Sequence, residues 1–289
     1  MDFAIGGFVM DEKRIETLEI IKILKHTYDL DVSMFAESFV EKTLHNRIHS
    51  TTQEINVYFS NLVSGNKEEA ILLRESLQNN FSDFFRDSSV FAQLERKILP
   101  KLIEENKNQR EIRVWSAGCS TGQEPYSIAM LLEDYMSFNG GRLRRYRIIA
   151  TDNSETALEY GRNGEYLTSE IQNLKLKHIN KYFTEQGENH LISEKIRDNV
   201  KFYTYDVLDQ SSVSPYESVF GDFDLVICCN LLIYYKQDIQ KFIINKLANS
   251  LSDSGYLILG NAEQNLVRGE FGIKKYTGEH SIFHKKTGR

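Results

Sequence analysis

Polar residues at four places in this 289-residue chain follow runs that are typical of buried strands. In chain order they are the turn Gly118–Gly122 with Glu124, then Asp152, then Asp206 with Val207, and finally Cys229 and Asn230 with Tyr234. The carboxyl ends of parallel strands meet at one edge of a sheet, where doubly wound sheets bind ligands. We therefore expect these residues to line one cleft.

The residue types in these places fit a nucleoside-like ligand. Glycines in the turn permit a tight bend and close approach of backbone to ligand, and the helix that follows presents free N–H groups. An acid at the position of Asp152 can accept both hydroxyls of a ribose. Asp206 and Val207 could read an adenine through a side-chain acceptor and a backbone amide. The turn lacks G-x-G-x-x-G spacing, which argues against a dinucleotide dehydrogenase.

Each of these positions also has a purely structural interpretation. Thr121 and Glu124 have the spacing of a helix capping box. Asp152 could be the N-cap of a helix that begins near Glu155. Tyr234 could be an aromatic side chain that packs a helix. The residues alone leave these alternatives open.

The elements that must position these residues alternate between strands and helices from about residue 110, which predicts a parallel α/β sheet with helices on both faces. The expected strands are Ile112–Ser116, Tyr146–Thr151, Val200–Tyr205, Asp224–Cys228, Gly255–Gly260 and Ser281–His284. The expected helices are Ser88–Glu105, Pro125–Phe138, Glu155–Arg162 and Lys236–Leu251. An insert at about residues 172–199, with a turn at Gln186–Asn189, predicts a small β-hairpin.

Residues 1–78 predict an all-α N-terminal domain that precedes a sheet domain of residues 79–289. Apolar residues recur there at helical spacing, as in Leu18, Ile21, Leu24 and Tyr28, and again in Phe35, Phe39, Val40 and Leu44. Further helices are expected at Gln53–Val63 and Lys67–Leu77, separated by the turn Ser64–Asn66. The first 78 residues contain 13 acidic and eight basic side chains, so they hold most of the formal net charge of -6.

Composition predicts a globular cytoplasmic protein. Hydrophobic residues make up 41% of the chain and charged residues 26%, and no apolar run approaches the roughly 18 residues that a membrane span needs. The N-terminus lacks the basic and apolar regions of a secretory signal. The three cysteines, Cys119, Cys228 and Cys229, have the spacing of neither a disulfide framework nor a metal site. The negative net charge argues against nucleic-acid binding.

The four strand ends together resemble the arrangement in class I methyltransferases, and five sequence blocks give a narrower resemblance. In chain order the blocks are Asn80–Arg86, similar to N-x-T-x-F-F-R; Trp115–Ser127, similar to W-S-A-G-C-S-T-G-E-E-P-Y-S; Ala150–Asp152, similar to A-[ST]-D; Asn230–Tyr235, similar to R-N-x-x-I-Y-F without the Arg; and Gly260–Glu263, similar to G-x-S-E. These motifs resemble those of the CheR family of chemotaxis receptor methyltransferases, over nearly the whole chain.

The resemblance implies a class I methyltransferase fold, with an inserted β-hairpin subdomain and an all-α N-terminal domain. It implies a signal-transduction enzyme, a protein-glutamate O-methyltransferase that uses S-adenosyl-L-methionine and releases S-adenosyl-L-homocysteine. The implied partners are acidic cytoplasmic helices of chemoreceptor-type proteins, and we expect a monomer without a metal ion. Arg86 and Tyr234 are implied beside the transferred methyl group and the acceptor. The implied cofactor contacts are Asn80, Ser82, Arg86, Glu124, Asp152, Asp206, Val207, Cys229 and Asn230.

Three of the implied cofactor contacts depart from the family pattern. Ser82 replaces a Thr and keeps the hydroxyl, and Asp206 stands where Asn is frequent. Cys229 replaces the usual Arg, which removes a fixed charge near the site. Two alternatives follow: a non-catalytic scaffold or regulatory relative that binds the cofactor, or a methyltransferase for another protein or a small molecule. Arg86 also has a structural alternative, an ion pair with Asp83 or Asp87.

Overall fold

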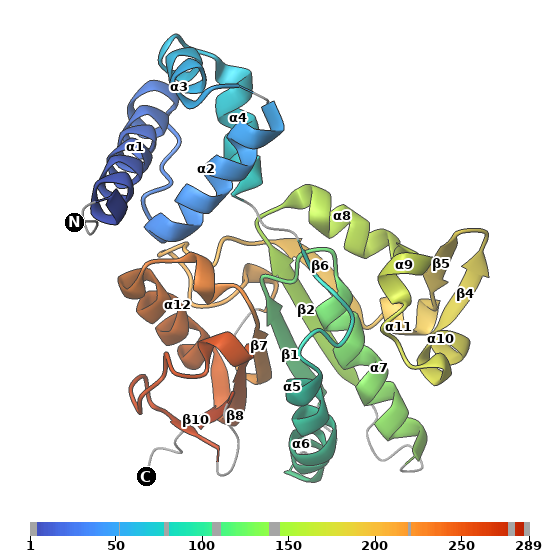
Figure 1. Ribbon diagram of the computed structural model, residues 1–289. Helices are drawn as coiled ribbons and strands as arrows, with labels where there is room; N and C mark the ends of the chain where they lie inside the picture. Colours follow the sequence, from blue (N-terminus) through green and yellow to red (C-terminus); the bar gives the residue numbers. More distant parts are fainter. Residues whose placement is uncertain are drawn as a thin grey trace. The chain divides into compact units, whose positions relative to one another are not determined.

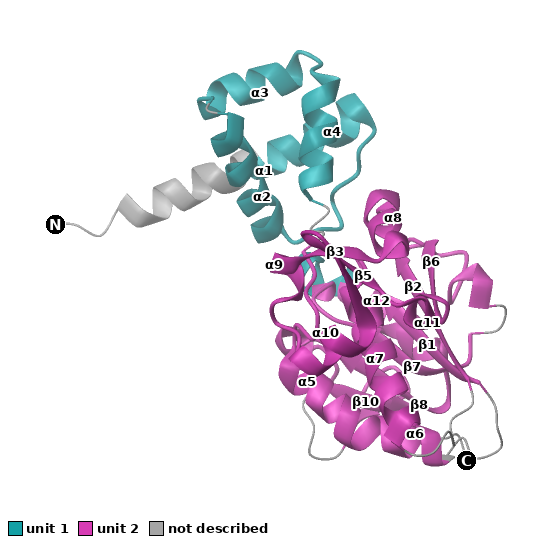
Figure 2. Cartoon of the chain, turned by 90° about the vertical axis from the view of Figure 1, so that its right-hand side faces the viewer, with its two compact units in different colours: residues 1–79, 233–239 teal, residues 80–232, 240–289 magenta. Residues whose placement is uncertain are grey.

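The computed structural model describes residues 5–51, 53–77, 81–105, 111–138, 145–218, 221–276 and 281–285 (Figure 1). The chain divides into two compact units (Figure 2). The helical unit comprises residues 1–79 and 233–239, and the sheet unit comprises residues 80–232 and 240–289.

Apolar side chains at helical spacing form the core of the helical unit. Its described helices are α1 (Ile5–Tyr28), α2 (Glu37–Thr51), α3 (Ile55–Val63) and α4 (Lys67–Ser76). Leu24, Leu44, Leu62 and Leu73, one from each helix, are almost fully buried in this core. Leu18 is 38% exposed, contrary to the predicted stripe, because the fully buried Ile20 takes the core position on α1.

A segment from the second half of the chain completes this unit. Phe35 forms an antiparallel bridge with Tyr235, and the two rings stack with centroids 5.2 Å apart. The N–H of Ala36 donates to the carbonyl of Tyr234 at 2.9 Å. The prediction of Phe35 within a helix is therefore wrong. α2 begins only at Glu37, because the backbone before it pairs with residues distant in sequence.

The sheet unit contains a seven-stranded sheet of order β6-β2-β1-β7-β8-β10-β9. Strands β6, β2, β1, β7 and β8 run parallel, and β10 is antiparallel to both of its neighbours. The chain moves outward from β1 to β2 and β6, then returns to place β7 beside β1, so the strand order reverses between β1 and β7. The bounds are β1 (Ile112–Ala117), β2 (Tyr146–Asp152), β6 (Val200–Thr204), β7 (Phe223–Cys228), β8 (Leu251–Leu259), β9 (Ile273–Lys275) and β10 (Ile282–Lys285).

Helices cover both faces of this sheet. A helical run of α5 (Ser88–Gln93), the π-helical η1 (Leu94–Ile98) and α6 (Leu99–Glu105) shares one core cluster with α7 (Gln123–Phe138) and α8 (Glu155–Asn163). Figure 1 shows α5, α6 and α7 in front of the strands. The strand order reverses before β7, and β7 and β8 are joined through α12 (Gln237–Asn249). Because connections between parallel strands are right-handed, this reversal puts α12 on the opposite face. The predicted doubly wound α/β architecture is confirmed.

The predicted hairpin is part of a three-stranded antiparallel sheet of order β3-β5-β4. Its two expected strands meet at Gly187, whose φ of 68° suits a tight turn. The third strand, β3, was not predicted, because three residues show no alternation of polar and apolar positions. We call residues 165–197 the inserted subdomain; its elements are β3 (Glu165–Leu167), α9 (Thr168–Ile171), α10 (Leu176–Tyr182), β4 (Phe183–Gln186), β5 (Asn189–Ile192) and α11 (Glu194–Arg197).

Two boundaries in the C-terminal part differ from prediction. β8 begins at Leu251, earlier than the expected Gly255, and the preceding helix ends at Asn249. The expected strand did not include the polar residues Ser252–Ser254, but Leu251 pairs with Phe223 and a register shift follows. β9 was also not predicted, since it too is only three residues long.

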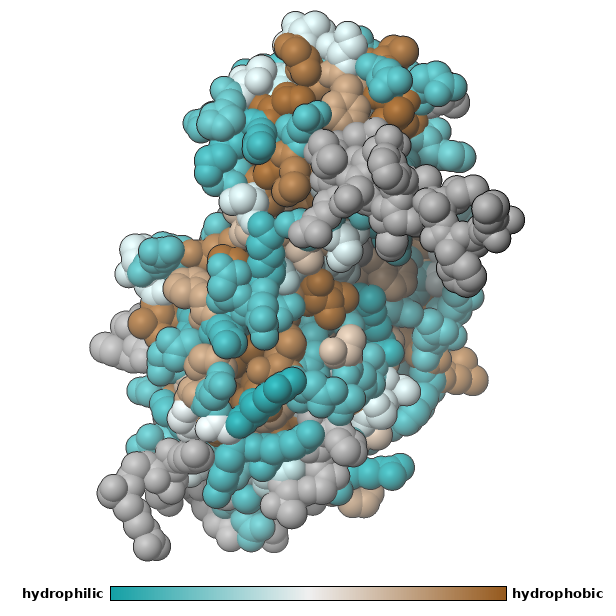
Figure 3. Space-filling view, turned by 60° about the vertical axis from the view of Figure 1, so that its left-hand side comes forward, coloured by the Kyte–Doolittle hydropathy of each residue, from teal (hydrophilic) through white to brown (hydrophobic). Residues whose placement is uncertain are grey.

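The surface mixes polar and apolar residues on the face that Figure 3 shows. Exposed apolar side chains of the helical unit include Val57 and Val63 of α3 and Ile71 of α4. Of the helices that the structure describes, none has both the length and the hydropathy that crossing a bilayer requires.

The start of α4 provides a test of the helical unit. Gly65 has a φ of 97°, and the Asn66 side chain accepts a bond of 3.1 Å from the N–H of Glu69. We expect Asn66→Ala to lower the free energy of unfolding by about 1 kcal/mol, because an N–H of the first turn loses its acceptor. Urea unfolding followed by circular dichroism measures this. Asn56→Ala, which removes an exposed amide from α3, should change little; equal losses in the two variants would contradict the capping role.

Candidate active site

The turn between β1 and α7 has positive φ at Gly118 (74°), Ser120 (50°) and Gly122 (93°). The N–H of Gly118 donates to the carbonyl of Thr151 at 2.8 Å, which ties the turn to β2. A Cβ atom at Gly118 would lie 2.9 Å from Cδ2 of Leu231, just beyond β7. Glycine is therefore required here both by the backbone conformation and by the close approach of the next loop.

Glu124, in the first turn of α7, directs its carboxyl group toward the strand ends. Ser116 Oγ donates to its Oε1 at 2.7 Å, and the Cys229 thiol also bonds to it. Burial raises the pKa of Glu124 to about 7, and the negative charges of Glu263 and Asp87 add to the rise. This carboxyl group is therefore close to half ionised at neutral pH.

Thr121 does not form the predicted reciprocal bonds with Glu124. Its hydroxyl donates to Gln123 Oε1 at 2.7 Å, and Glu124 is bonded to Ser116 instead. The capping-box interpretation is wrong for these side chains. The spacing fits the motif, but the Glu124 carboxyl group bonds to Ser116 at the end of β1 and to Cys229 beyond β7.

Asp152 ends β2, and its carboxylate holds the backbone of two segments. Oδ2 accepts from the N–H of Ser120 at 2.9 Å, and Oδ1 accepts from the N–H of Ser154 at 3.0 Å. Burial raises the pKa of Asp152, and these backbone bonds oppose the rise. The N-cap of α8 is Ser154, whose hydroxyl accepts from the N–H of Ala157 at 3.3 Å. The interpretation of Asp152 as that cap is therefore wrong.

Asp206 and Val207 lie just beyond β6, beside the same edge. The N–H of Tyr205 donates to the carbonyl of Asp152 at 3.0 Å, which joins this loop to the end of β2. The exposed Asp206 accepts from the N–H of Leu208 at 2.8 Å and so closes an Asx-type turn, and Val207 is buried.

Glu263 fixes the loop after β7. This fully buried carboxylate accepts from three backbone N–H groups: Asn230 at 3.0 Å, Leu232 at 2.7 Å and Gly260 at 2.9 Å. The bonds hold Asn230 at a φ of 59°. Glu263 was part of the G-x-S-E resemblance but was missing from the predicted site. Its position in the sequence gives no sign that it reaches across to β7.

Arg86 is exposed on a corner of the chain that precedes α5. Its NH1 donates to the carbonyl of Phe81 at 3.1 Å, and its guanidinium carbon lies 5.0 Å from the centre of the Phe81 ring. Asp83 accepts from Asn173 at 2.7 Å, and Asp87 accepts from the N–H of Asn261 at 3.2 Å. Among the described residues, the Arg86 guanidinium therefore contacts the carbonyl group and the ring of Phe81. The structural alternative for Arg86, an ion pair with Asp83 or Asp87, is wrong.

The remaining candidates lie in different places. Ser82 is half-buried on the same segment as Arg86, and Asn80 lies outside the described residues. Tyr234 belongs to the helical unit, where its ring lies 4.6 Å from that of Phe39. It also lines a cavity of about 520 Å³ in that unit, together with Lys42 and Arg47 among others. Tyr234 therefore both packs against a residue of α2 and lines a cavity.

The carboxyl edge of the sheet thus gathers Glu124, Asp152, Cys229 and Asn230 around one glycine turn. Glu263 and Asp87 are close enough to Glu124 for their negative charges to raise the pKa of its carboxyl group further. Such a site favours a ligand with positive charge, and S-adenosylmethionine carries an ammonium and a sulfonium group. The strand order, the reversal beside the glycine turn and this acidic edge define a class I methyltransferase.

Comparisons with known proteins give the family. The description "CheR methyltransferase, SAM binding domain" matches residues 80–277. A chemotaxis protein methyltransferase of Listeria monocytogenes is 30% identical over 93% of this chain and 97% of its own. One from Borreliella burgdorferi is 33% identical over 86% and 87%, and "Cher2" of Pseudomonas putida is 36% identical over 65% and 67%. The chain belongs to the CheR methyltransferase family, and its cofactor is S-adenosylmethionine.

Removing the charge of Glu263 tests how the β7 loop is held. We expect Glu263→Gln to weaken S-adenosylmethionine binding by about tenfold, because the amide loses charge-assisted bonds and turns a donor toward backbone N–H groups. Isothermal titration calorimetry measures the affinity. Glu270→Gln, at an exposed position near β9, is the matched control. Unchanged affinity in Glu263→Gln would show that the loop does not depend on this carboxylate.

Proposed function

We propose that this protein transfers the methyl group of S-adenosylmethionine to side-chain carboxylates of glutamates on chemoreceptor-type proteins, forming methyl esters. The observation that supports this best is the placement of Arg86. Its guanidinium is exposed and oriented by Phe81, and the next residue, Asp87, influences the buried Glu124. A fixed cation beside a methyl-donor site suits an anionic acceptor. Membership of the CheR family and relatives named chemotaxis protein methyltransferases agree with it.

The proposed reaction needs no general base. A glutamate side chain has an ordinary pKa near 4.3, so it is already ionised at pH 7. Bound S-adenosylmethionine supplies an activated methyl group on a sulfonium. An acceptor oxygen forms the new bond to carbon as the bond from carbon to sulfur breaks, and S-adenosylhomocysteine is released. Two opposite charges disappear in this step, so a site that excludes water favours it, provided that the reactants are held in line.

Arg86 would hold the acceptor carboxylate through charge-assisted hydrogen bonds. The hydrogen bond to the Phe81 carbonyl and the contact with the Phe81 ring limit the directions in which the guanidinium can point. Tyr234 is the second residue that we propose contacts the acceptor. The term catalytic residue applies to these two in this proposal.

We propose that the two acidic side chains at the strand ends orient the cofactor. Glu124 would take the ammonium group of the methionine part, and Asp152 the ribose hydroxyls. The loop after β6 would take the adenine. The full proposed set is Asn80, Ser82, Arg86, Glu124, Asp152, Asp206, Val207, Cys229 and Asn230.

The acceptor surface that we propose on the helical unit has few available cations. Arg47 forms a two-pronged pair with Glu69, with both N···O distances 2.8 Å, and Tyr58 bonds to the same carboxylate. Lys42 is exposed and lines the cavity beside Tyr234. We propose that Lys42, more than Arg47, faces the acidic cytoplasmic helices of a receptor.

Labelled cofactor identifies the modified group directly. The protein is incubated with methyl-labelled S-adenosylmethionine and receptor-containing membranes, and the product is treated with base. Label released as methanol supports carboxyl methylation of the receptor. Base-stable label would instead indicate N-methylation, and no label despite cofactor binding would indicate a scaffold.

Replacement of Arg86 tests the acceptor site. We expect Arg86→Ala to lower the rate of methyl transfer by about a hundredfold, because the carboxylate loses its charged, two-pronged partner. Arg86→Lys should recover only part of the rate, since a single ammonium cannot reproduce the fork. The far-ultraviolet circular dichroism spectrum and the midpoint of thermal unfolding, which should match those of the wild type, are the control for folding. Undiminished transfer by Arg86→Ala would contradict the assigned role.

The pKa of Glu124 predicts how cofactor affinity depends on pH. Its carboxyl group, with a pKa of about 7, must be ionised to pair with an ammonium. Between pH 6 and pH 7 the ionised fraction rises from about a tenth to about a half, so affinity should rise about fivefold. Calorimetric titrations at both pH values measure this. Glu124→Gln should bind more weakly with no such rise; a rise of the same size in that variant would exclude Glu124 as its source.

A further inference from the structure

The corner that bears Arg86 is strained at the preceding residue. Phe85 has a φ of 52°, a left-handed conformation that is unfavourable for a bulky side chain. Such conformations persist only where surrounding contacts hold them, and they concentrate at functional sites. The contacts that hold Phe85 therefore also determine the position of the backbone from which the Arg86 side chain extends.

The backbone of the corner is bonded to helix α7. The N–H of Phe85 donates to Ser127 Oγ at 3.1 Å. Ser127 is fully buried, and its own hydroxyl donates to the carbonyl of Gln123 at 2.7 Å. One turn of α7 thus connects the corner with the segment that bears Glu124.

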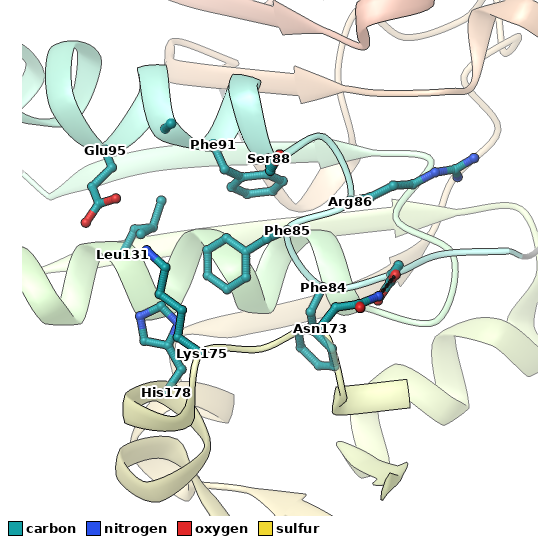
Figure 4. Close-up of a pocket in the computed structure, with 12 residues that line it drawn as sticks. Phe84, Phe85, Arg86, Ser88, Phe91, Glu95, Leu131, Asn173, Lys175 and His178 are labelled. Atoms are coloured by element: carbon teal, nitrogen blue, oxygen red, sulfur yellow. Dashed lines mark hydrogen bonds between the residues drawn. The ribbon is translucent and has the colours of Figure 1, made fainter. Parts of the chain in front are cut away.

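The side chains of the corner pack against the inserted subdomain. Phe85 stacks on His178, with centroids 5.2 Å apart and planes 14° from parallel. Phe84 packs edge-on against Tyr166 at 4.9 Å and Phe183 at 5.7 Å. Figure 4 shows the Phe85 ring directed toward the side of Lys175 and His178, whereas Arg86 extends the opposite way. Two adjacent aromatic rings thus secure the corner on one side and leave Arg86 on the other.

His178 is itself held firmly. It is 2% exposed, and its Nε2 lies 3.2 Å from Oδ2 of Asp134 on α7. Asp134 also accepts bonds from Lys181 and Tyr182 of the same helix as His178. Burial lowers the pKa of His178, which favours the neutral ring for stacking. The stacking partner of Phe85 is therefore part of a fixed network.

The same subdomain reaches the cofactor turn. The hydroxyl of Tyr166 donates to the carbonyl of Thr121 at 2.8 Å, and its ring packs against Phe84. One side chain of the inserted subdomain therefore contacts both the glycine turn and the segment that bears Arg86.

A cavity beside the stacked rings of Phe85 and His178 leaves space into which the Phe85 side chain could move. It has a volume of about 310 Å³, and its lining includes Phe85, Phe91, Leu131 and His178 (Figure 4). If the ring of His178 were absent, the Phe85 ring could move into this space and the strained backbone could leave its left-handed conformation.

We propose that the inserted subdomain is a brace that positions Arg86, with His178 as the positioning residue that acts through Phe85. Its consequence for methyl transfer rests on the proposed function, whereas the brace itself does not. Because the inserted subdomain contacts both Phe84 and Phe85, it fixes the backbone next to Arg86, whose guanidinium we propose binds the acceptor. His178 touches neither cofactor nor acceptor in this role.

Hydrogen exchange at Phe85 tests the brace without any acceptor. In His178→Ala the amide of Phe85 should exchange about tenfold faster than in the wild type, because the stack that holds its bond to Ser127 is lost. The matched control is His190→Ala, which removes a histidine of β5 that bonds to Thr168 and not to the corner. Its effect at Phe85 should stay within about twofold. Phe85→Leu removes the same stack and serves if His178→Ala does not fold. Unchanged exchange in the folded variant would overturn the brace.

Kinetics then test the positioning of Arg86. His178→Ala should lower kcat for methyl transfer by about tenfold. KM for S-adenosylmethionine should change by less than about twofold, because Arg86 is one of nine proposed cofactor contacts and the other eight stay in place. His178→Phe, which keeps an aromatic ring but loses the bond to Asp134, should restore most of kcat. Faster exchange with undiminished kcat would overturn the positioning role. A wild-type protein that does not esterify glutamates would refute the proposed function, while the exchange measurement would still decide the brace.

Discussion

Carboxyl groups buried at one edge of a parallel sheet are the constraint on which this molecule depends. A buried carboxylate must be compensated by hydrogen bonds or by positive charge. Asp152 and Glu263 meet this need with backbone N–H groups, and in doing so they fix the glycine turn and the loop after β7. Among the residues that the structure describes, Glu124 bonds to one hydroxyl and one thiol, and burial raises its pKa to about 7. A positively charged ligand would supply what Glu124 lacks.

Local patterns in the sequence predicted most of the sheet unit. The alternation of apolar strands and helices, the glycine turn and the acid that ends β2 are each encoded in adjacent residues, and together they predicted the sheet edge at which we propose that the cofactor binds. Features that depend on pairing between distant segments were not predictable. The bridge between Phe35 and Tyr235 and the reach of Glu263 to Asn230 join residues with no shared local signal. Periodicity therefore gave no sign of Glu263, whereas the motif resemblance included it among its matching residues.

Cys229 becomes easier to interpret in this setting. The family usually has an arginine at this position, and a fixed cation there would favour the ionised form of a neighbouring carboxyl group. The Cys229 thiol bonds to Glu124, and burial beside that carboxyl group raises the pKa of the thiol well above its usual range, so it stays neutral. The bond from Cys229 therefore brings no positive charge to Glu124. It leaves the acidic edge suited to a cationic ligand.

The most direct test of this account is the titration of Glu124 itself, followed by NMR through a labelled side-chain carboxyl carbon. The free protein should show a midpoint near pH 7. With saturating S-adenosylhomocysteine, whose ammonium group remains, the midpoint should fall by more than about one pH unit, because the paired carboxylate is stabilised in its ionised form. The same midpoint with and without the ligand would contradict the claim that the cofactor's charge compensates this buried acid.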